Sequence, residues 1–211
     1  MGWYQDIIFP KLMHWNIGKK SILKKRAALL KHAYGNILEI GIGEGTNLSL
    51  YPTEITHITA VEAYPRKLQN SVVDVTLFAE SAGALHFDDN IFDTVVSTFS
   101  LCSVDNLEQV CAEVYRVLKP GGIFLFLEHG SANSKLFKKI QHLFNPLYNK
   151  YAYGCNIIRS YQDNIRKSGL DIVYLKINHA PIYPRFLTGY VYEGIAKKNS
   201  QEKKGEKSSG F

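Results

Sequence analysis

A glycine-rich turn at Leu38–Leu48, LEIGIGEGTNL, carries the residue types best suited to holding a ligand. Gly41, Gly43 and Gly45 follow an apolar run, and glycines at the end of a parallel strand let a ligand approach the backbone closely. The spacing is G-x-G-x-G, and Thr46 stands where the dinucleotide fingerprint G-x-G-x-x-G has its last glycine. The turn therefore predicts a ligand site and leaves three candidates: a dinucleotide, a phosphate group or another adenosine-bearing ligand.

Two acidic residues narrow the choice of ligand. Glu39 lies two residues before Gly41 in an apolar strand end, where a buried carboxylate is costly unless a cation or hydrogen-bond donors meet it. The ammonium or sulfonium of a ligand would serve as that cation. Glu62 ends the next apolar run, seventeen residues after Gly45, where a carboxylate can accept both hydroxyls of a ribose. An adenosine joined to an amino acid with a positive centre describes S-adenosylmethionine, which is the predicted cofactor.

Short apolar runs alternate with helical patterns along the middle of the chain, which is typical of βαβ units and a parallel sheet. We expect strands at 36–40, 57–62, 74–78, 94–98 and 123–128, joined by helices at 45–51, 65–71 and 105–118. A helix at 161–168 and strands at 170–177 and 189–197 follow. The predicted class is α/β, with a doubly wound, mostly parallel sheet.

Four segments together resemble a known family. LEIGIGEGTNL, VEAYPR, FDTVVSTFSLCSV and EVYRVLKPGGIFLFLEHG stand in the order and spacing of the class I S-adenosylmethionine-dependent methyltransferases, over residues 36–130. The resemblance implies a Rossmann-like sheet of seven strands with the last one antiparallel. The segments LCSV, LEH, GCNIIR and YEGIA look like the branch that holds bacterial small-molecule or lipid methyltransferases and membrane-associated thiol methyltransferases of animals, over residues 3–196.

The resemblance places further residues at the cofactor. Ser81 and Ala82, which follow the third strand, are expected beside the adenine, although Glu80 replaces the small residue that is usual before them. Ser97 and Thr98, at the end of the fourth strand, are expected beside the methionine part of the cofactor.

The acceptor side is predicted from residues that follow the fourth and fifth strands. Methyl transfer from a sulfonium needs a base only where the nucleophile arrives protonated, and His129, directly after the fifth strand, is the leading candidate. The alternative is a histidine that hydrogen-bonds the following loop. Cys102 is expected to line the same edge as a small apolar residue rather than a reactive thiol. Asn156 and Arg159 are expected to orient a polar or anionic substrate group, unless Arg159 pairs with a core carboxylate.

Charge and motif composition argue against a nucleic-acid partner. Residues 39–128 carry a net charge of −9, whereas 1–38 and 129–196 carry +6 each and 197–211 carries +3. A nucleic-acid binder gathers its basic charge on one reading surface. Amine-methylating DNA enzymes of the family have Asp or Asn, two prolines and an aromatic after the fourth strand, but this chain has Phe99–Cys102, FSLC, there. A flipped base is therefore not the expected acceptor.

One domain is expected from 211 residues of which 45% are hydrophobic. Its predicted parts are a helical lid at 1–35, a cofactor-binding core at 36–130, a substrate-side helix and terminal strands at 131–196, and a disordered basic tail at 197–211. The three cysteines have neither metal-ligand spacing nor the density of a disulfide scaffold. We therefore predict no metal site and a reducing compartment.

Two apolar and basic elements flank the acidic core. Both tryptophans lie within the first fifteen residues, and residues 134–150 carry an apolar stripe with lysines beside it. These elements are expected to close the substrate pocket as lid helices, and the sharper hypothesis adds contact with an anionic membrane surface. No apolar run approaches the ~20 residues that span a bilayer and no signal peptide is seen, so the predicted location is cytoplasmic, or peripheral on the inner membrane surface.

The predicted activity is methyl transfer to a small, hydrophobic or amphiphilic acceptor such as a lipid amine or a thiol. A nicotinamide-dependent oxidoreductase is one alternative, against which Glu39 and the glycine spacing argue. An S-adenosylmethionine-binding protein without catalysis is the other.

Overall fold

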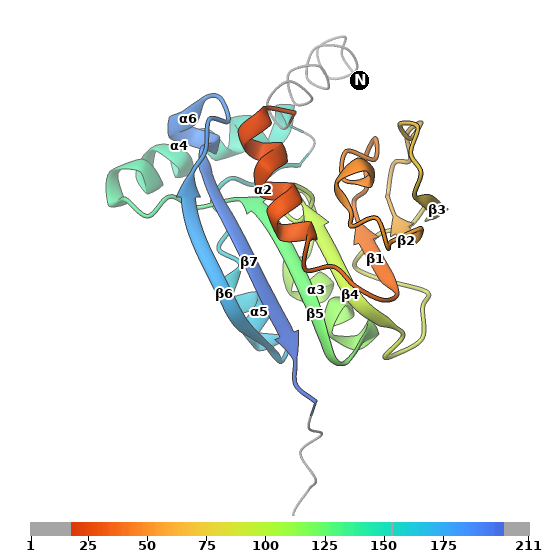
Figure 1. Ribbon diagram of the computed structural model, residues 1–211. Helices are drawn as coiled ribbons and strands as arrows, with labels where there is room; N and C mark the ends of the chain where they lie inside the picture. The colour runs from red at the N-terminus through yellow and green to blue at the C-terminus, as the bar shows by residue number, and fades with distance from the viewer. Residues whose placement is uncertain (1–17, 153, 201–211) are drawn as a thin grey trace, which may run out of the picture.

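The computed structural model describes residues 18–152 and 154–200 of the chain (Figure 1). Its centre is a seven-stranded sheet in the order β3-β2-β1-β4-β5-β7-β6. The strands are β1 Ile37–Ile40, β2 His57–Val61, β3 Asp74–Phe78, β4 Phe92–Thr98, β5 Leu118–His129, β6 Leu170–His179 and β7 Tyr190–Lys198. Neighbours among β1 to β5 are parallel, and β7 runs antiparallel to both β5 and β6. The predicted fold class is confirmed.

Helices cover both faces of this sheet. α2, Lys20–Leu30, lies across one face, and α3, Leu107–Val117, and α5, Gln162–Lys167, lie on the other (Figure 1). Two apolar clusters reflect this layering, because α2 packs with Ile37 and Leu125 in one, whereas α3 and α5 pack with Phe124 and Phe126 in the other. Successive residues of a strand point to opposite faces, so β5 supplies both clusters.

The carboxyl ends of β4 and β5 lie at the same edge as two further helices. α4, Lys135–Tyr151, and the short α6, Arg185–Thr188, contact each other and lie at the same upper end of the sheet in Figure 1. This edge is where an open parallel sheet presents its ligand sites.

The helix predicted at 45–51 is wrong, because only one 3-10 turn, η2 Leu48–Leu50, forms there. Gly45 has a φ of +80°, which no right-handed helix contains, and Pro52 holds Tyr51 in an extended conformation. Too few residues remain between them to repay helix nucleation. A ligand at this turn therefore meets backbone N–H groups of a loop, not the end of a helix.

The helix predicted at 65–71 is also wrong, and that segment lies in an irregular loop. The backbone N–H of Gln69 donates to the carbonyl oxygen of Glu44 at 2.9 Å, so a long-range contact replaces a helical one. The loop is thereby attached to the glycine turn.

The other predicted elements form within a few residues of their expected bounds. α3 begins after Asn106, whose side chain accepts a hydrogen bond from the N–H of Gln109, and it ends before LKPGG, which enters β5. The predicted first lid helix with both tryptophans, and residues 201–211 of the predicted tail, lie outside the described residues.

Candidate active site at the carboxyl edge of the sheet

The glycine turn leaves β1 with three positive φ angles and one open side. Gly41 has a φ of +70° and donates its N–H to the carbonyl oxygen of Val61 at 2.8 Å, which ties the turn to β2. A Cβ at Gly41 would overlap the side chain of Ser100, whereas a Cβ at Gly43 would meet no heavy atom within 4 Å. Gly43 is thus the point where the backbone faces free space that suits a ligand.

Glu62 lies beside that open point. Its Oε2 accepts the N–H of Gly43 at 3.0 Å, and its Oε1 accepts the N–H of Tyr64 at 3.2 Å. A carboxylate has about four acceptor positions, so both oxygens keep capacity for the hydroxyls of a ribose. The structure brings the predicted ribose acid and the glycine turn together.

Glu39 has a different surrounding. The side chain is buried, and its oxygens accept hydrogen bonds from Asn47 Nδ2 at 2.9 Å and from the Tyr51 hydroxyl at 2.7 Å. Burial raises the pKa of Glu39 to about 7, against the effect of these two hydrogen bonds. The donors that the buried carboxylate needs are therefore supplied by the chain itself.

Arg26 is a member of this network that the sequence did not indicate. Its guanidinium is buried and donates to Asn47 Oδ1 and to Thr98 Oγ1, both at 2.6 Å. Burial lowers the pKa of Arg26 to about 10, opposed first by the charge of Glu39. The arginine thereby connects α2 to the glycine turn and to β4. Arg26 lies four residues after the buried Ile22, and this spacing could have indicated that it shares the buried face of α2.

The end of β4 is held by a second buried acid, Glu128. Its Oε1 accepts the Ser97 hydroxyl at 2.8 Å and the backbone N–H groups of Ser100 and Leu101 at 3.0 and 3.1 Å. Burial raises the pKa of Glu128 to about 7. The hydroxyls of Ser97 and Thr98 are thus both engaged inside the protein, and their contact with the cofactor stays a prediction.

The segment predicted beside the adenine follows β3 at the same edge. Ser81 is exposed and its hydroxyl accepts the N–H of Gly83 at 3.3 Å, whereas Ala82 is buried. Glu80 Oε2 contacts His86 Nδ1 at 2.6 Å, and Glu80 Oε1 is buried with no hydrogen-bond partner within the described part of the chain. This buried acceptor adjoins the segment expected beside the adenine, and the adenine roles of Ser81 and Ala82 stay predictions.

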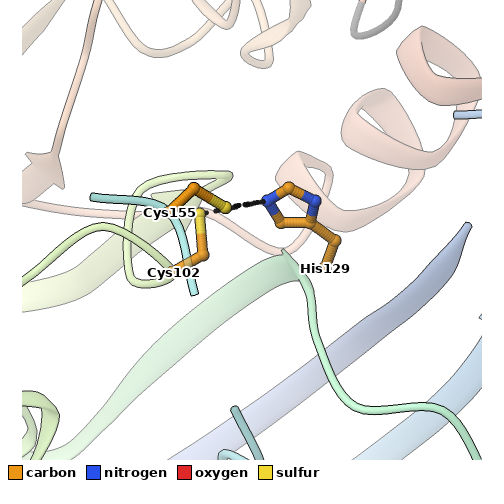
Figure 2. A group of neighbouring side chains, drawn as sticks. All are labelled: Cys102, His129 and Cys155. Atoms are coloured by element: carbon orange, nitrogen blue, oxygen red, sulfur yellow. Dashed lines mark hydrogen bonds between the residues drawn. The ribbon is translucent and has the colours of Figure 1, made fainter. Parts of the chain in front are cut away.

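Cys102, His129 and Cys155 meet in one buried cluster, although 27 and 26 residues separate them along the chain. Figure 2 shows both sulfurs directed at the same ring nitrogen: Nε2 of His129 lies 3.1 Å from Cys102 Sγ and 3.0 Å from Cys155 Sγ. Nδ1 has no hydrogen-bond partner among the described residues. The general-base role of His129 stays a prediction.

The three groups of the cluster shift one another's pKa values. A hydrogen bond from Cys155 and then the charge of His129 hold the pKa of Cys102 well below its usual range, against burial. Burial acts to lower the pKa of His129, but the charge and hydrogen bond of Cys102 raise it overall. The pKa of Cys155 is raised, first by its hydrogen bond to Cys102 and then by burial. Cys102 is buried in an apolar cluster and also contacts His129, and its place beside the acceptor stays a prediction.

Asn156 and Arg159 hold the segment that carries Cys155 against the loop after β4. The N–H of Asn156 donates to the carbonyl oxygen of Cys102 at 2.8 Å. The guanidinium of Arg159 donates to the carbonyl oxygens of Leu101 and Val104. Within the part of the chain that the structure describes, Arg159 pairs with backbone and not with a core carboxylate, and the substrate role of both residues stays a prediction.

An apolar groove adjoins the cluster. It has a volume of about 380 Å³ and is lined by Phe144, Leu147, Tyr148, Tyr151 and Leu187. Leu187 and Tyr148 also pack in the apolar cluster that contains Cys102 and Cys155. The edge of the sheet thus presents a glycine turn with an acid beside it and, next to the cysteines, an apolar groove.

This seven-stranded sheet, with its glycine turn and its acid at the end of β2, defines the class of S-adenosylmethionine-dependent methyltransferases. The family described as "Methyltransferase domain" matches residues 38–126. The chain is 30% identical over 174 residues to the human protein "Thiol S-methyltransferase TMT1A", which covers 77% of this chain and 70% of that one. The chain therefore belongs to the class I S-adenosylmethionine-dependent methyltransferases, and S-adenosylmethionine is its cofactor.

Other relatives agree with this class. The mouse mitochondrial "2-methoxy-6-polyprenyl-1,4-benzoquinol methylase" is 41% identical over 64 residues, which cover 30% of this chain and 20% of that protein. Among solved structures, an S-adenosylmethionine-dependent methyltransferase from Thermotoga maritima superposes with a TM-score of 0.67 at 18% identity, covering 93% and 98% of the two chains, and so shows the same fold. Family membership selects the methyltransferase over the oxidoreductase alternative. Within residues 18–152 and 154–200, no helix is long and apolar enough to cross a membrane.

Proposed function

We propose that this enzyme transfers a methyl group to the sulfur of a small thiol with an apolar body. The observation that carries the proposal is the extent of the similarity to the human thiol S-methyltransferase, 174 residues and 77% of the chain. The quinol methylases of mouse and chicken match 64 and 113 residues, 30% and 47% of the chain, so they resemble a smaller part of it. The match to the thiol enzyme, at 174 residues, extends beyond residues 38–126.

The apolar groove supports the same acceptor class. Aromatic and aliphatic side chains of α4 and α6 line it, so the body of an acceptor would be held by burial of apolar surface. A site of this kind suits an acceptor that is apolar except for the sulfur atom that receives the methyl group.

The chemistry requires little covalent work from the protein. S-adenosylmethionine supplies a methyl group on a sulfonium; the acceptor sulfur would bond to that methyl carbon, S-adenosylhomocysteine would leave, and the thiol proton would pass to solvent. Gly43 and Glu62 are proposed to hold the backbone and ribose side of the cofactor, with Ser81 and Ala82 beside the adenine. The remaining task is to align the acceptor and exclude water, which the groove and the buried edge of the sheet are suited to do.

An acceptor panel tests the proposed function. The full chain is incubated with S-adenosylmethionine and a thiol, an alcohol, an amine and a phenol of matched apolar body, and methylated products are measured by mass spectrometry. We expect the thioether as the main product, because only the thiol yields a soft nucleophile near neutral pH. Methylation of the amine or phenol without the thiol would contradict the proposed acceptor.

We also propose that α4 rests on an anionic membrane surface. Its apolar stripe stands open to solvent, with Leu143 75% and Leu147 58% exposed, instead of packing on the sheet. Lys135, Lys138 and Lys139 are exposed on the same helix. Apolar side chains beside lysines on an interfacial helix gain from both lipid burial and anionic headgroups.

Liposome sedimentation tests the membrane proposal. We expect the enzyme to bind anionic vesicles at low salt and the double variant Leu143→Glu, Leu147→Glu to bind at least about tenfold more weakly, since two apolar contacts are each replaced by a charge. Val72→Glu is the matched control, because Val72 is 97% exposed but lies far from α4, in the loop before β3. Equal binding of both variants, or no binding by the unaltered chain, would refute the role of α4.

A further inference from the structure

The cluster of Cys102, His129 and Cys155 is poorly explained as a set of ordinary hydrogen bonds. One ring nitrogen has either one N–H or one lone pair, yet two sulfurs lie within 3.1 Å of Nε2. All three donor atoms lie within 4.8 Å of one another and all three side chains are buried. Three convergent soft donors around one point are the arrangement of a metal site.

We infer that Cys102, His129 and Cys155 bind a Zn²⁺-type metal ion whose fourth position takes the sulfur of the acceptor. Thiolate and imidazole are ligands that Zn²⁺ prefers, and three protein ligands with one open position are typical of catalytic zinc sites. Two thiolates and a neutral imidazole with one divalent cation have no net charge, which suits a buried site. The acceptor part of this inference rests on the proposed function, whereas the metal site does not.

The geometry requires little movement to admit the ion. Zn–S bonds of about 2.3 Å and Zn–N bonds of about 2.0 Å in a tetrahedron place neighbouring ligand atoms roughly 3.5–3.8 Å apart. The two sulfurs lie 3.1 and 3.0 Å from Nε2, so each needs to move outward by less than ~1 Å. The cysteines come from the loop after β4 and the segment after α4, which are joined by a backbone hydrogen bond from Asn156 to Cys102 and by the side chain of Arg159.

The position of the groove connects the ion to the acceptor. Leu187 and Tyr148 belong both to the groove lining and to the apolar cluster around Cys102 and Cys155. A thiol whose body lies in the groove would reach the ion with its sulfur. Coordination releases the thiol proton to solvent and leaves a thiolate, so the proton is removed without a protein base. His129 then serves as a ligand instead of the general base that the sequence predicted.

Titration of the reduced, metal-free full chain with Co²⁺ tests the site without any methyl transfer. We expect one equivalent to bind, with thiolate-to-cobalt charge-transfer absorption and the visible bands of a tetrahedral ion, and Zn²⁺ to displace it. Cys102→Ala and Cys155→Ala should each weaken binding at least about 100-fold, because each removes a ligand. Cys111→Ala should bind as the unaltered chain does, because burial raises the pKa of this α3 thiol to about 12 and it lies outside the cluster.

Unaltered S-adenosylmethionine affinity in the two cluster variants shows that they are folded. Absence of stoichiometric Co²⁺ binding by the reduced chain would overturn the metal site. Formation of a Cys102–Cys155 disulfide on mild oxidation, in a chain that binds no metal when reduced, would point to a redox pair instead. Adding a small apolar thiol to the Co²⁺ form should increase the charge-transfer absorption. If metal binds without that increase, the metal site stands but the acceptor does not coordinate the ion. If the metal-free enzyme methylates the thiol, acceptor coordination is likewise refuted, whereas the proposed function stands.

Discussion

Gly41→Ala should lower the melting temperature by an amount on the order of 10 °C, whereas Gly43→Ala should lower it by only a few degrees. Both glycines have positive φ, which costs alanine about 1–2 kcal/mol at either position. At Gly41 the new Cβ would also lie 2.5 Å from Cβ of Ser100, and such overpacking adds about 1–3 kcal/mol. At Gly43 no heavy atom lies within 4 Å, so the strain of φ stands alone.

The two variants should also differ in cofactor binding, and here the larger effect is expected at Gly43. Gly43→Ala is expected to weaken S-adenosylmethionine binding at least about tenfold in calorimetric titration, because the added methyl group enters the space beside Glu62 where the cofactor would lie. Thermal unfolding and titration of both variants measure the two effects separately. Unchanged affinity in Gly43→Ala would show that the cofactor does not approach this part of the turn.

Glu62→Gln should weaken S-adenosylmethionine binding by roughly 10- to 100-fold with little change in melting temperature. Hydrogen bonds to a charged acceptor contribute about 1.5–3 kcal/mol, and the amide group both loses the charge and directs a donor at the N–H of Gly43 or Tyr64. Calorimetric titration with S-adenosylmethionine measures the loss.

Glu54→Gln is the matched control for this variant. Glu54 is an exposed acid in the loop before β2, so its change removes the same charge from the acidic core without touching the turn. Equal losses of affinity in both variants would indicate a general effect of charge instead of a ribose contact.

The local errors of the sequence prediction have a common cause. The patterns at 45–51 and 65–71 are compatible with a helix, but both segments are short. Gly45 and Pro52 limit the first, and a backbone hydrogen bond to Glu44 holds the second. The backbone N–H of Gln69 donates to the carbonyl oxygen of Glu44, so a group that a helix would use is engaged elsewhere. Longer elements such as α3, with a cap and a full apolar stripe, were predicted closely.

The network around Glu39 could be predicted only in part. A carboxylate in an apolar strand end requires donors, and this much follows from the sequence. That the donors are Asn47 and Tyr51 depends on the path of the turn after β1, and Arg26 joins them because α2 crosses the sheet there. The sequence therefore indicated that Glu39 requires hydrogen-bond donors, but not which residues supply them.

The sequence by itself determined the class of fold and the methyl donor, because strand periodicity, the glycine turn and the acid at Glu62 are patterns within short stretches. Only the tertiary structure decided that Cys102, His129 and Cys155 share one point beside the groove. These residues come from three elements whose spacing along the chain follows no metal-site signature. Their meeting depends on loop paths at the carboxyl edge of the sheet, which local residue patterns do not specify.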